Sequence, residues 1–258
     1  MNLLLLRAHE VDADGHAFLP ACDRRCRHLR QVLKVGPGQT LRAGVVDGPL
    51  GAARIEEVGD AGVRLACTFD PAPLPAPTDV LVLAVPRPKV LLRCVETAAA
   101  LGFAKILLVR TWRTDKSHVL ASAMALPALH AHAILGLEQA RRTRSPQIEV
   151  HDRFRPFVED QLDAGCGPSV RILADPDADL DLADALAVAT PGTGLEGLPQ
   201  RALALAIGPE RGFTDFEREL LASRGFVACH AGRHPLRVET ALAWVYAQMH
   251  LLGARAGG

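Results

Sequence analysis

Residues 202–241 read ALALAIGPERGFTDFERELLASRGFVACHAGRHPLRVETA, and this stretch decides the fold. The first six residues are all apolar, and a run without alternation is typical of a strand buried on both faces of a parallel sheet. The glycine-bearing sequence GPERG at 208–212 interrupts the run. Thr214 and Glu217 then have the spacing of a capping box, which predicts a helix directly after the glycines.

A second loop follows the same plan. Residues 226–230 predict a short strand, residues 231–236 an irregular loop, and apolar residues at helical spacing predict a closing helix from about Arg237. Two glycine-bearing loops therefore leave one edge of the sheet, where ligands bind in open α/β proteins. From the spacing alone, Gly208 and Gly212 fit a simple strand-to-helix turn, because they match neither the dinucleotide fingerprint nor the P-loop.

The rest of the chain divides into two parts. In the first part, the sequence predicts a strand at residues 3–7 and a basic amphipathic helix at residues 22–35. It also predicts short strands, with turns between them, at residues 40–46, 52–58 and 62–69. The first part is therefore expected to be a small, mostly antiparallel β unit. The proline-rich sequence at 71–78 is typical of a stiff linker. From residue 79 onward, predicted strands (79–85, 105–109, 169–174) alternate with helices (to residue 101, 117–140, 154–162, 181–188), which favours parallel α/β architecture. The 117–140 helix is expected to be interrupted or kinked at Pro127.

Composition excludes several classes of protein. The chain has 29 basic and 29 acidic residues, so any contact with RNA has to use local basic patches. It has six scattered cysteines, no leader sequence and no apolar run of the roughly 18 residues needed to cross a membrane. These features predict a cytoplasmic protein with free thiols that does not span a membrane. The Cys22, Cys26 and His28 pattern lacks a second ligand pair, so no metal site is expected.

Two motifs in the C-terminal stretch, and their separation along the chain, resemble those of the uridine-N3 methyltransferases of small-subunit (16S) ribosomal RNA. These enzymes are a branch of the SPOUT (trefoil-knot) superfamily. IGPERGFTDFE matches the family's GPEGGF-like loop, and GRHPLRVETALA matches its later LGPR-I-LR-x-ETA segment. HLRQVLKVGPGQ and EQARRTRSPQI are similar to two further family segments. The chain departs from the family at Arg211, where glycine is usual, and at Arg233 and His234, where a Pro-Arg pair is usual.

The resemblance implies a fold and a reaction. The fold is α/β: a C-terminal SPOUT-type parallel-sheet domain with a deep trefoil knot at 79–258, and a PUA-like RNA-binding β-barrel domain at 1–70, joined by the linker at 71–78. The reaction is S-adenosylmethionine-dependent methylation of N3 of a uridine in small-subunit ribosomal RNA, free or in the assembling particle. The implied assembly is a homodimer.

The resemblance also suggests roles for single residues. Arg237 is expected to stabilise the uracil anion, and Glu239, with Glu210 as the alternative, to orient or deprotonate the base; the competing interpretation is that Glu239 only interacts with its helix dipole. The expected cofactor-binding residues lie in the two loops: Ile207, Gly208, Glu210, Gly212, Gly232 and Leu236. The expected RNA contacts are arginines of the N-terminal helix and of two later loops: Arg24, Arg25, Arg27, Arg30, Arg113, Arg142 and Arg144.

Two other functions remain open from the sequence. A ribose 2′-O RNA methyltransferase would share the fold but methylate another atom. A non-catalytic RNA-binding ribosome-assembly factor would have lost the methyl-donor pocket, and Arg211 is a feature that favours this alternative.

Overall fold

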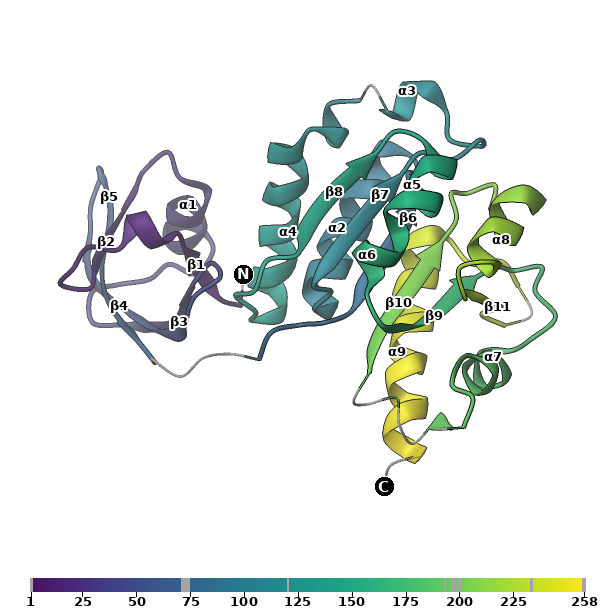
Figure 1. Cartoon of the computed structure of the whole chain (residues 1–258). Coiled ribbons are helices and arrows are strands. Elements are labelled where there is room, and N and C mark those ends of the chain that lie inside the picture. Colours follow the sequence, from purple (N-terminus) through teal and green to yellow (C-terminus); the bar gives the residue numbers. More distant parts are fainter. Residues whose placement is uncertain are drawn as a thin grey trace. The chain divides into compact units, whose positions relative to one another are not determined.

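The computed structural model describes residues 2–70, 75–119, 121–192, 194–195, 198, 201–232 and 234–256. Contacts divide the chain into two compact units, drawn in Figure 1. The first unit contains residues 1–76 together with 134–145, and the second contains residues 77–133 and 146–258. Half of the predicted linker, residues 71–74, lies outside the described residues.

The first unit is built on a five-stranded sheet with the strand order β1-β3-β4-β5-β2. The strands are β1 (Leu4–Leu6), β2 (His16–Pro20), β3 (Thr40–Val45), β4 (Leu50–Val58) and β5 (Gly62–Phe69). Only β1 and β3 pair in parallel, so the prediction of a mostly antiparallel unit is confirmed. A short 3-10 helix η1 (Ala8–Glu10) precedes β2, and helix α1 (Arg24–Gln31) buries Cys26 and Leu29 against the strands.

Residues 134–145 belong with this first unit, although they are far from it in the sequence. The Thr143 hydroxyl donates to the carbonyl of Gly48 at 2.7 Å, and the Asp47 N–H donates to the Thr143 carbonyl at 2.8 Å. A Cβ added at Gly44 would lie 2.7 Å from Thr143 Cγ2, so this β3 position has no room for a side chain. The segment therefore packs tightly against β3 and the turn that follows it.

The second unit contains a six-stranded, wholly parallel sheet with the order β11-β9-β10-β6-β7-β8. Its strands are β6 (Val80–Ala84), β7 (Lys105–Val109), β8 (Gln147–His151), β9 (Ser169–Ala174), β10 (Ala202–Ile207) and β11 (Val227–Cys229). Strand β10 has the predicted bounds and is almost wholly buried, as its unbroken apolar sequence requires. The parallel α/β prediction is thus confirmed.

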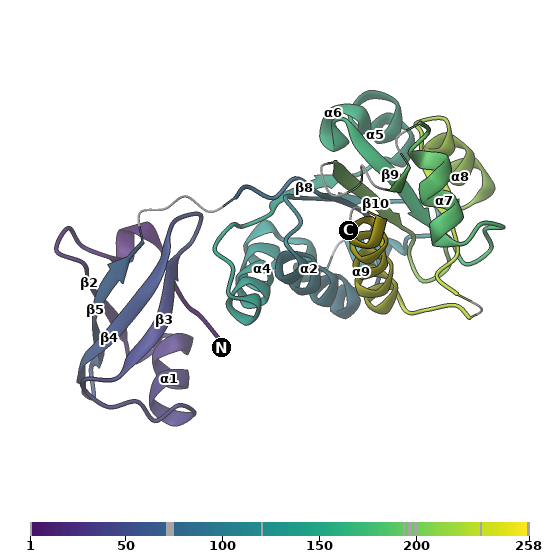
Figure 2. The ribbon, with the colours of Figure 1, turned by 90° about the horizontal axis from the view of Figure 1, so that it is seen from below.

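Helices cover both faces of this sheet (Figure 2). Helices α2 (Pro88–Leu101), α9 (Val238–Ala256) and the first part of α4 (Leu126–Ala140) lie on one face, and α5 (Phe154–Asp160), α6 (Leu162–Cys166) and α8 (Asp215–Ala222) on the other. Helix α7 (Leu182–Ala189) packs beside β9 and β11. No helix in the described ranges is long and apolar enough to cross a membrane.

Three local predictions are wrong. The single helix expected over 117–140 is instead α3 (Lys116–Val119), a 3-10 turn η2 (Ser122–Met124) and α4, because Pro127 occupies the first turn of a new helix, where its missing N–H costs nothing. The helix expected over 154–162 ends at Asp160, and α6 begins two residues later. Strand β2 was not expected. Helix α1 is shorter than predicted: it begins at Arg24 because Asp23 caps it by accepting the Arg25 N–H at 2.7 Å, and it ends at Gln31.

Candidate functional site: a pocket between two C-terminal loops

A pocket of about 570 Å³ lies at the carboxyl ends of β9 and β10. Its walls are the loop after β10, the loop before α9 and the first turns of α2 and α9. Seven of the residues singled out in the sequence line it: Ile207, Gly208, Glu210, Gly212, Leu236, Arg237 and Glu239. Folding therefore brings together two motifs that are separated by more than twenty residues in the chain.

The glycines give the first loop its shape. The Gly212 N–H donates to the Pro209 carbonyl at 2.8 Å, and Gly212 has a φ of +67°, which an L side chain rarely adopts. A Cβ added at Gly208 would lie 3.1 Å from Gly212 Cα, so the loop folds closely onto itself. Arg211, in contrast, is not among the described residues with left-handed backbone, and replacing the family's glycine there costs no strain.

Side chains from neighbouring elements brace this loop. The Glu210 carboxylate accepts the Arg87 N–H at 3.0 Å and so ties the loop to the start of α2. The Arg113 guanidinium donates to the carbonyls of Arg211 and Phe213. Arg113, expected to contact RNA, is therefore engaged in holding the pocket wall.

The capping box predicted for α8 is confirmed, and it has an additional partner. The Glu217 N–H donates to Thr214 Oγ1 at 3.3 Å, and the Thr214 N–H donates to Glu217 Oε2 at 2.8 Å. The other carboxylate oxygen of Glu217 accepts the backbone N–H of Trp112 at 2.7 Å. This buried carboxylate thus joins α8 to the loop after β7.

The two expected catalytic residues lie at the start of α9. The Arg237 carbonyl accepts the N–H groups of Thr240 and Ala241, so Arg237 is the residue from which the helix begins. Its side chain is exposed and makes no ion pair with any described residue. Glu239 is mostly buried, and its carboxylate lies 3.6 Å from the Arg93 guanidinium of α2.

The pocket contains functional groups that the sequence analysis missed. Asp175 follows β9 directly and is buried, and its carboxylate accepts a hydrogen bond from Arg218 at 3.1 Å. Arg87 directly precedes α2, and Arg93 lies on it. The position of Asp175 directly after a buried strand could have predicted its role in the pocket. No sequence pattern predicts the two arginines, because only the fold brings the start of α2 to this edge.

Cys94, on α2, is fully buried near two carboxylates that line the pocket. Burial, followed by the nearby carboxylates of Glu239 and Glu210, raises the pKa of Cys94 to about 12. A thiol with that pKa stays protonated at neutral pH and cannot attack a methyl donor.

The second loop lines the pocket with only part of its length. Gly232 has a φ of +123°, and its N–H donates to His230 Nδ1 at 3.3 Å. Gly232 does not line the pocket, although Pro235 and Leu236 do. Arg233 lies outside the described residues, and His234 is exposed.

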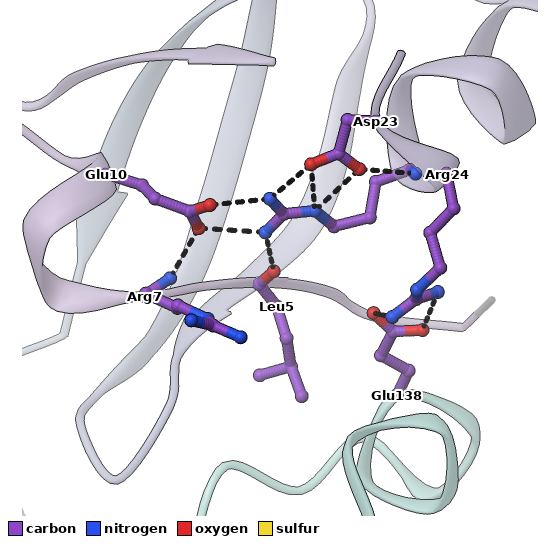
Figure 3. Close-up of polar contacts among 7 residues, drawn as sticks. Leu5, Arg7, Glu10, Asp23, Arg24 and Glu138 are labelled. Carbon is purple, nitrogen blue, oxygen red and sulfur yellow. Dashed lines mark hydrogen bonds and ion pairs between the residues drawn. The ribbon is translucent and has the colours of Figure 1, made fainter. Parts of the chain in front are cut away.

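Two of the arginines expected to contact RNA are used inside the first unit (Figure 3). The Arg25 side chain is only 11% exposed; it contacts the carboxylates of Glu10 and Asp23 and donates to the Leu5 carbonyl at 2.7 Å. Burial alone would lower its pKa, but the two carboxylates raise it above the usual value. Arg24 makes a bidentate pair, at 2.9 and 2.7 Å, with the buried carboxylate of Glu138.

The other arginines of this unit are more available. Arg27 and Arg142 are exposed and form no ion pair within the described part of the chain. Arg30 lies 3.6 Å from the fully exposed Asp60, and Arg144 donates to the Asp47 carbonyl at 3.1 Å. Arg141 has a φ of +59°, a left-handed backbone conformation that residues other than glycine rarely adopt.

No group of three or more histidine, cysteine or acidic side chains in the described segments is placed to hold a metal ion. His132, on α4, pairs with Glu96.

Comparison with known proteins identifies the family. The model of the RNA methyltransferase domain matches residues 73–250. The ribosomal RNA small subunit methyltransferase E of Treponema pallidum is 34% identical over 247 residues, which cover 93% of this chain and 87% of that protein. The methyltransferase E 1 of Borreliella burgdorferi is 23% identical over 93% of this chain and 94% of its own length.

Solved structures agree on the fold. The small subunit methyltransferase E of Neisseria gonorrhoeae bound to S-adenosylmethionine has a TM-score of 0.72 at 20% identity, covering 97% of this chain and 98% of that one. A putative methyltransferase of Legionella pneumophila, also with bound S-adenosylmethionine, has a TM-score of 0.71 at 22% identity over 98% and 97%. The chain belongs to the RNA methyltransferase family and is an RNA methyltransferase.

Proposed function

We propose that this protein transfers a methyl group from S-adenosylmethionine to N3 of a uridine in small-subunit (16S) ribosomal RNA. The supporting observation is that the loop residues and the start of α9 form one pocket. The names of the Treponema and Borreliella relatives supply the small-subunit ribosomal RNA as substrate class. Such a substrate fits a cytoplasmic protein.

The pocket suits S-adenosylmethionine in size and chemistry. Its volume of about 570 Å³ is in the usual range for small-molecule sites. Gly208 and Gly212 let the backbone come close to a ligand, so that amides and carbonyls can hydrogen-bond an adenine. Ile207, Phe213 and Leu236 supply apolar surface. When bound, the sulfonium of S-adenosylmethionine supplies the methyl group.

The uridine N3 proton has to leave as the methyl group arrives. Arg237 is exposed at the pocket and unpaired with described carboxylates, so its guanidinium can stabilise the negative charge that develops on uracil. Glu239 is held by Arg93, which suits an orienting role at the helix start better than that of a free base. N3 is hydrogen-bonded in a base pair, so the uridine has to be unpaired or flipped out.

The N-terminal unit is proposed as the RNA-positioning part, with a PUA-like fold. Arg27 and Arg142 are its exposed, unpaired arginines among those expected to contact RNA, and phosphate contacts position a nucleic acid without reading its sequence. Arg24 and Arg25 leave the proposed RNA-binding set because carboxylates already hold them.

A deep trefoil knot in the second unit is part of the proposal. It is supported by the family resemblance and by the central place of β10 between β9 and β6. Mechanical stretching of single molecules tests it: a knotted chain stops short of the length of about 3.3–3.6 Å per residue that an open chain reaches. Extension to the full length would contradict the knot.

A homodimer is proposed because α9 has apolar residues on two sides. Leu242, Val245 and Met249 are buried, whereas Trp244 and Leu251 are 54% and 50% exposed. A second copy that covers this exposed side would bury it. Light scattering should give twice 27.6 kDa, and a stable mass of one chain would contradict the dimer.

Two experiments separate the alternatives. Calorimetry with S-adenosylmethionine should show binding to the purified protein, whereas a non-catalytic assembly factor with a lost pocket would give no heat. Nucleoside mass spectrometry of small-subunit RNA from cells lacking the gene should show loss of one 3-methyluridine. Loss of a ribose-methylated nucleoside would instead identify a 2′-O methyltransferase.

A further inference from the structure

A second pocket opens at the same edge of the six-stranded sheet. It has a volume of about 760 Å³, and its walls come from the loop after β7, the loop after β8 and the first turn of α8. Trp112 lies in the loop after β7, Arg153 in the loop after β8 and Phe216 in the first turn of α8. None of its residues lines the methyl-donor pocket.

Trp112 is the most unusual side chain of this second pocket. Trp112 is 87% exposed, although its backbone N–H donates a hydrogen bond to the buried Glu217 carboxylate at 2.7 Å. The preceding residue is fixed as well, because the Thr111 N–H donates to Thr114 Oγ1 at 3.1 Å. The fold thus fixes the backbone of a tryptophan whose ring it does not bury.

A second exposed aromatic residue completes the pair. Phe216, on the first turn of α8, is 53% exposed and lines the same pocket as Trp112. Exposed aromatic rings at a pocket are the usual platforms for unpaired bases, because every base has a face that can stack.

The charge of the pocket favours a nucleic acid. Arg110 and Arg153 line it and make no ion pair with described residues, while Arg155 is held by Glu159 at 2.8 Å. Of the acidic residues, Glu217 is buried and already accepts backbone N–H groups, which leaves Asp152 as the exposed carboxylate. Two free guanidiniums beside two exposed rings match phosphates next to a base.

The second pocket adjoins the methyl-donor pocket. Phe154 in its wall contacts Phe213 in the wall of the donor pocket, with ring centroids 6.0 Å apart. The two pockets therefore lie on either side of one aromatic pair. An RNA strand with its target uridine against the bound methyl donor would carry a neighbouring nucleotide towards the second pocket.

We propose that the pocket of Trp112 and Phe216 binds an unpaired base near the methylated uridine, with Arg110 and Arg153 on the adjoining phosphates. This inference rests on the proposed function for the identity of the ligand as RNA. The pocket is a positioning site for the substrate strand, and no residue in it takes part in the methyl transfer.

Tryptophan fluorescence tests the proposal directly. The chain has two tryptophans, so Trp244→Phe leaves Trp112 as the single reporter. Titration with a ten-nucleotide single-stranded RNA should quench its emission, and the same sequence as a duplex should quench it far less, because paired bases are already stacked. Equal emission with and without the single strand would overturn the proposal.

Substitutions test the energetic contribution. Trp112→Ala should raise the Kd for small-subunit RNA about 5- to 100-fold, whereas Trp112→Phe should retain most of the affinity. Arg110→Gln and Arg153→Gln should each reduce the slope of log K against log salt by about 0.7. Val188→Ala, which alters a 58% exposed side chain on α7, is the matched control and should change neither quantity.

The outcomes distinguish this pocket from the proposed function. If Trp112→Ala binds RNA like the parent while methyl transfer continues, the pocket proposal fails and the proposed function stands. If the parent neither binds S-adenosylmethionine nor methylates RNA, the proposed function fails, whatever the fluorescence shows.

Discussion

Replacing Gly208 by alanine should weaken the binding of S-adenosylmethionine by a predictable amount. The new Cβ would lie 3.1 Å from Gly212 Cα and 3.2 Å from both the Gly212 carbonyl carbon and a Phe213 ring carbon. Ordinary carbon contacts are about 3.5–4.0 Å, and two of these neighbours are backbone atoms, so the loop itself has to shift by a few tenths of an ångström. We expect the shift to cost about one net hydrogen bond to the donor, about 1 kcal/mol, which raises Kd about fivefold.

Calorimetry measures this change, and other glycines supply matched controls. Gly36→Ala meets no atom within 4 Å, so it should leave the Kd unchanged. Gly212 and Gly225 have φ values of +67° and +80° and equally open surroundings, so alanine at either should cost about 1 kcal/mol of stability. Only Gly212→Ala should also weaken donor binding. If Gly208→Ala binds the donor as tightly as Gly36→Ala, the pocket is assigned to the wrong loop.

Three further predictions concern catalysis, pH dependence and the RNA-binding unit. Arg237→Ala should lower the single-turnover rate about 100- to 1000-fold with an unchanged Kd for S-adenosylmethionine; a loss of donor affinity alone would contradict its role in stabilising charge. Burial raises the pKa of Asp79, but hydrogen bonds from three donors outweigh it and hold the pKa below the usual value. The ionised Asp79 therefore stabilises the fold fully above its unfolded-state pKa, and this stabilisation is lost as the pH falls through its folded-state pKa. Asp79→Asn should lower the free energy of unfolding, measured in urea, at pH 7 and should lower it progressively less below about pH 4. A loss of unfolding free energy that does not change with pH would be inconsistent with this. Arg25→Ala should cost about 1.5–3 kcal/mol of stability because it leaves the part-buried carboxylates of Glu10 and Asp23 without their guanidinium partner, whereas Arg27→Gln should leave stability unchanged and weaken RNA binding; the reverse pattern would refute the division of roles.

Much of the second unit follows from local sequence. Strand β10 is apolar throughout because both of its faces are covered, and the helix after it begins at a Thr-x-x-Glu capping box. Both signals depend on neighbouring residues only. The same holds for the glycine loop, where the positive φ of Gly212 gives a physical reason for the residue type.

The contacts of individual arginines do not follow from local sequence. Arg25 and Arg27 lie two residues apart on one short helix, and nothing in the local sequence distinguishes them. Arg25 is nevertheless buried between carboxylates, whereas Arg27 is exposed to solvent. Glu10, which pairs with Arg25, is fifteen residues away, and Glu138, which pairs with Arg24, is more than a hundred away. A charged sequence thus predicts a basic surface only after the ion pairs of the fold are known.

The pocket that contains Trp112 was also beyond the sequence. Trp112 and Arg153 lie in two different loops and Phe216 lies at the start of α8, and only the parallel order of β7, β8 and β10 brings these three segments to one edge. No single segment carries a motif for it.

Transfer of an isotopically labelled methyl group tests the central claim most directly. The purified protein, labelled S-adenosylmethionine and small-subunit RNA from cells lacking the gene are incubated, and the RNA is digested to nucleosides for mass spectrometry. The account predicts one labelled 3-methyluridine per RNA molecule, absent with the Arg237→Ala variant. Label on a ribose, or none on the RNA at all, would contradict it.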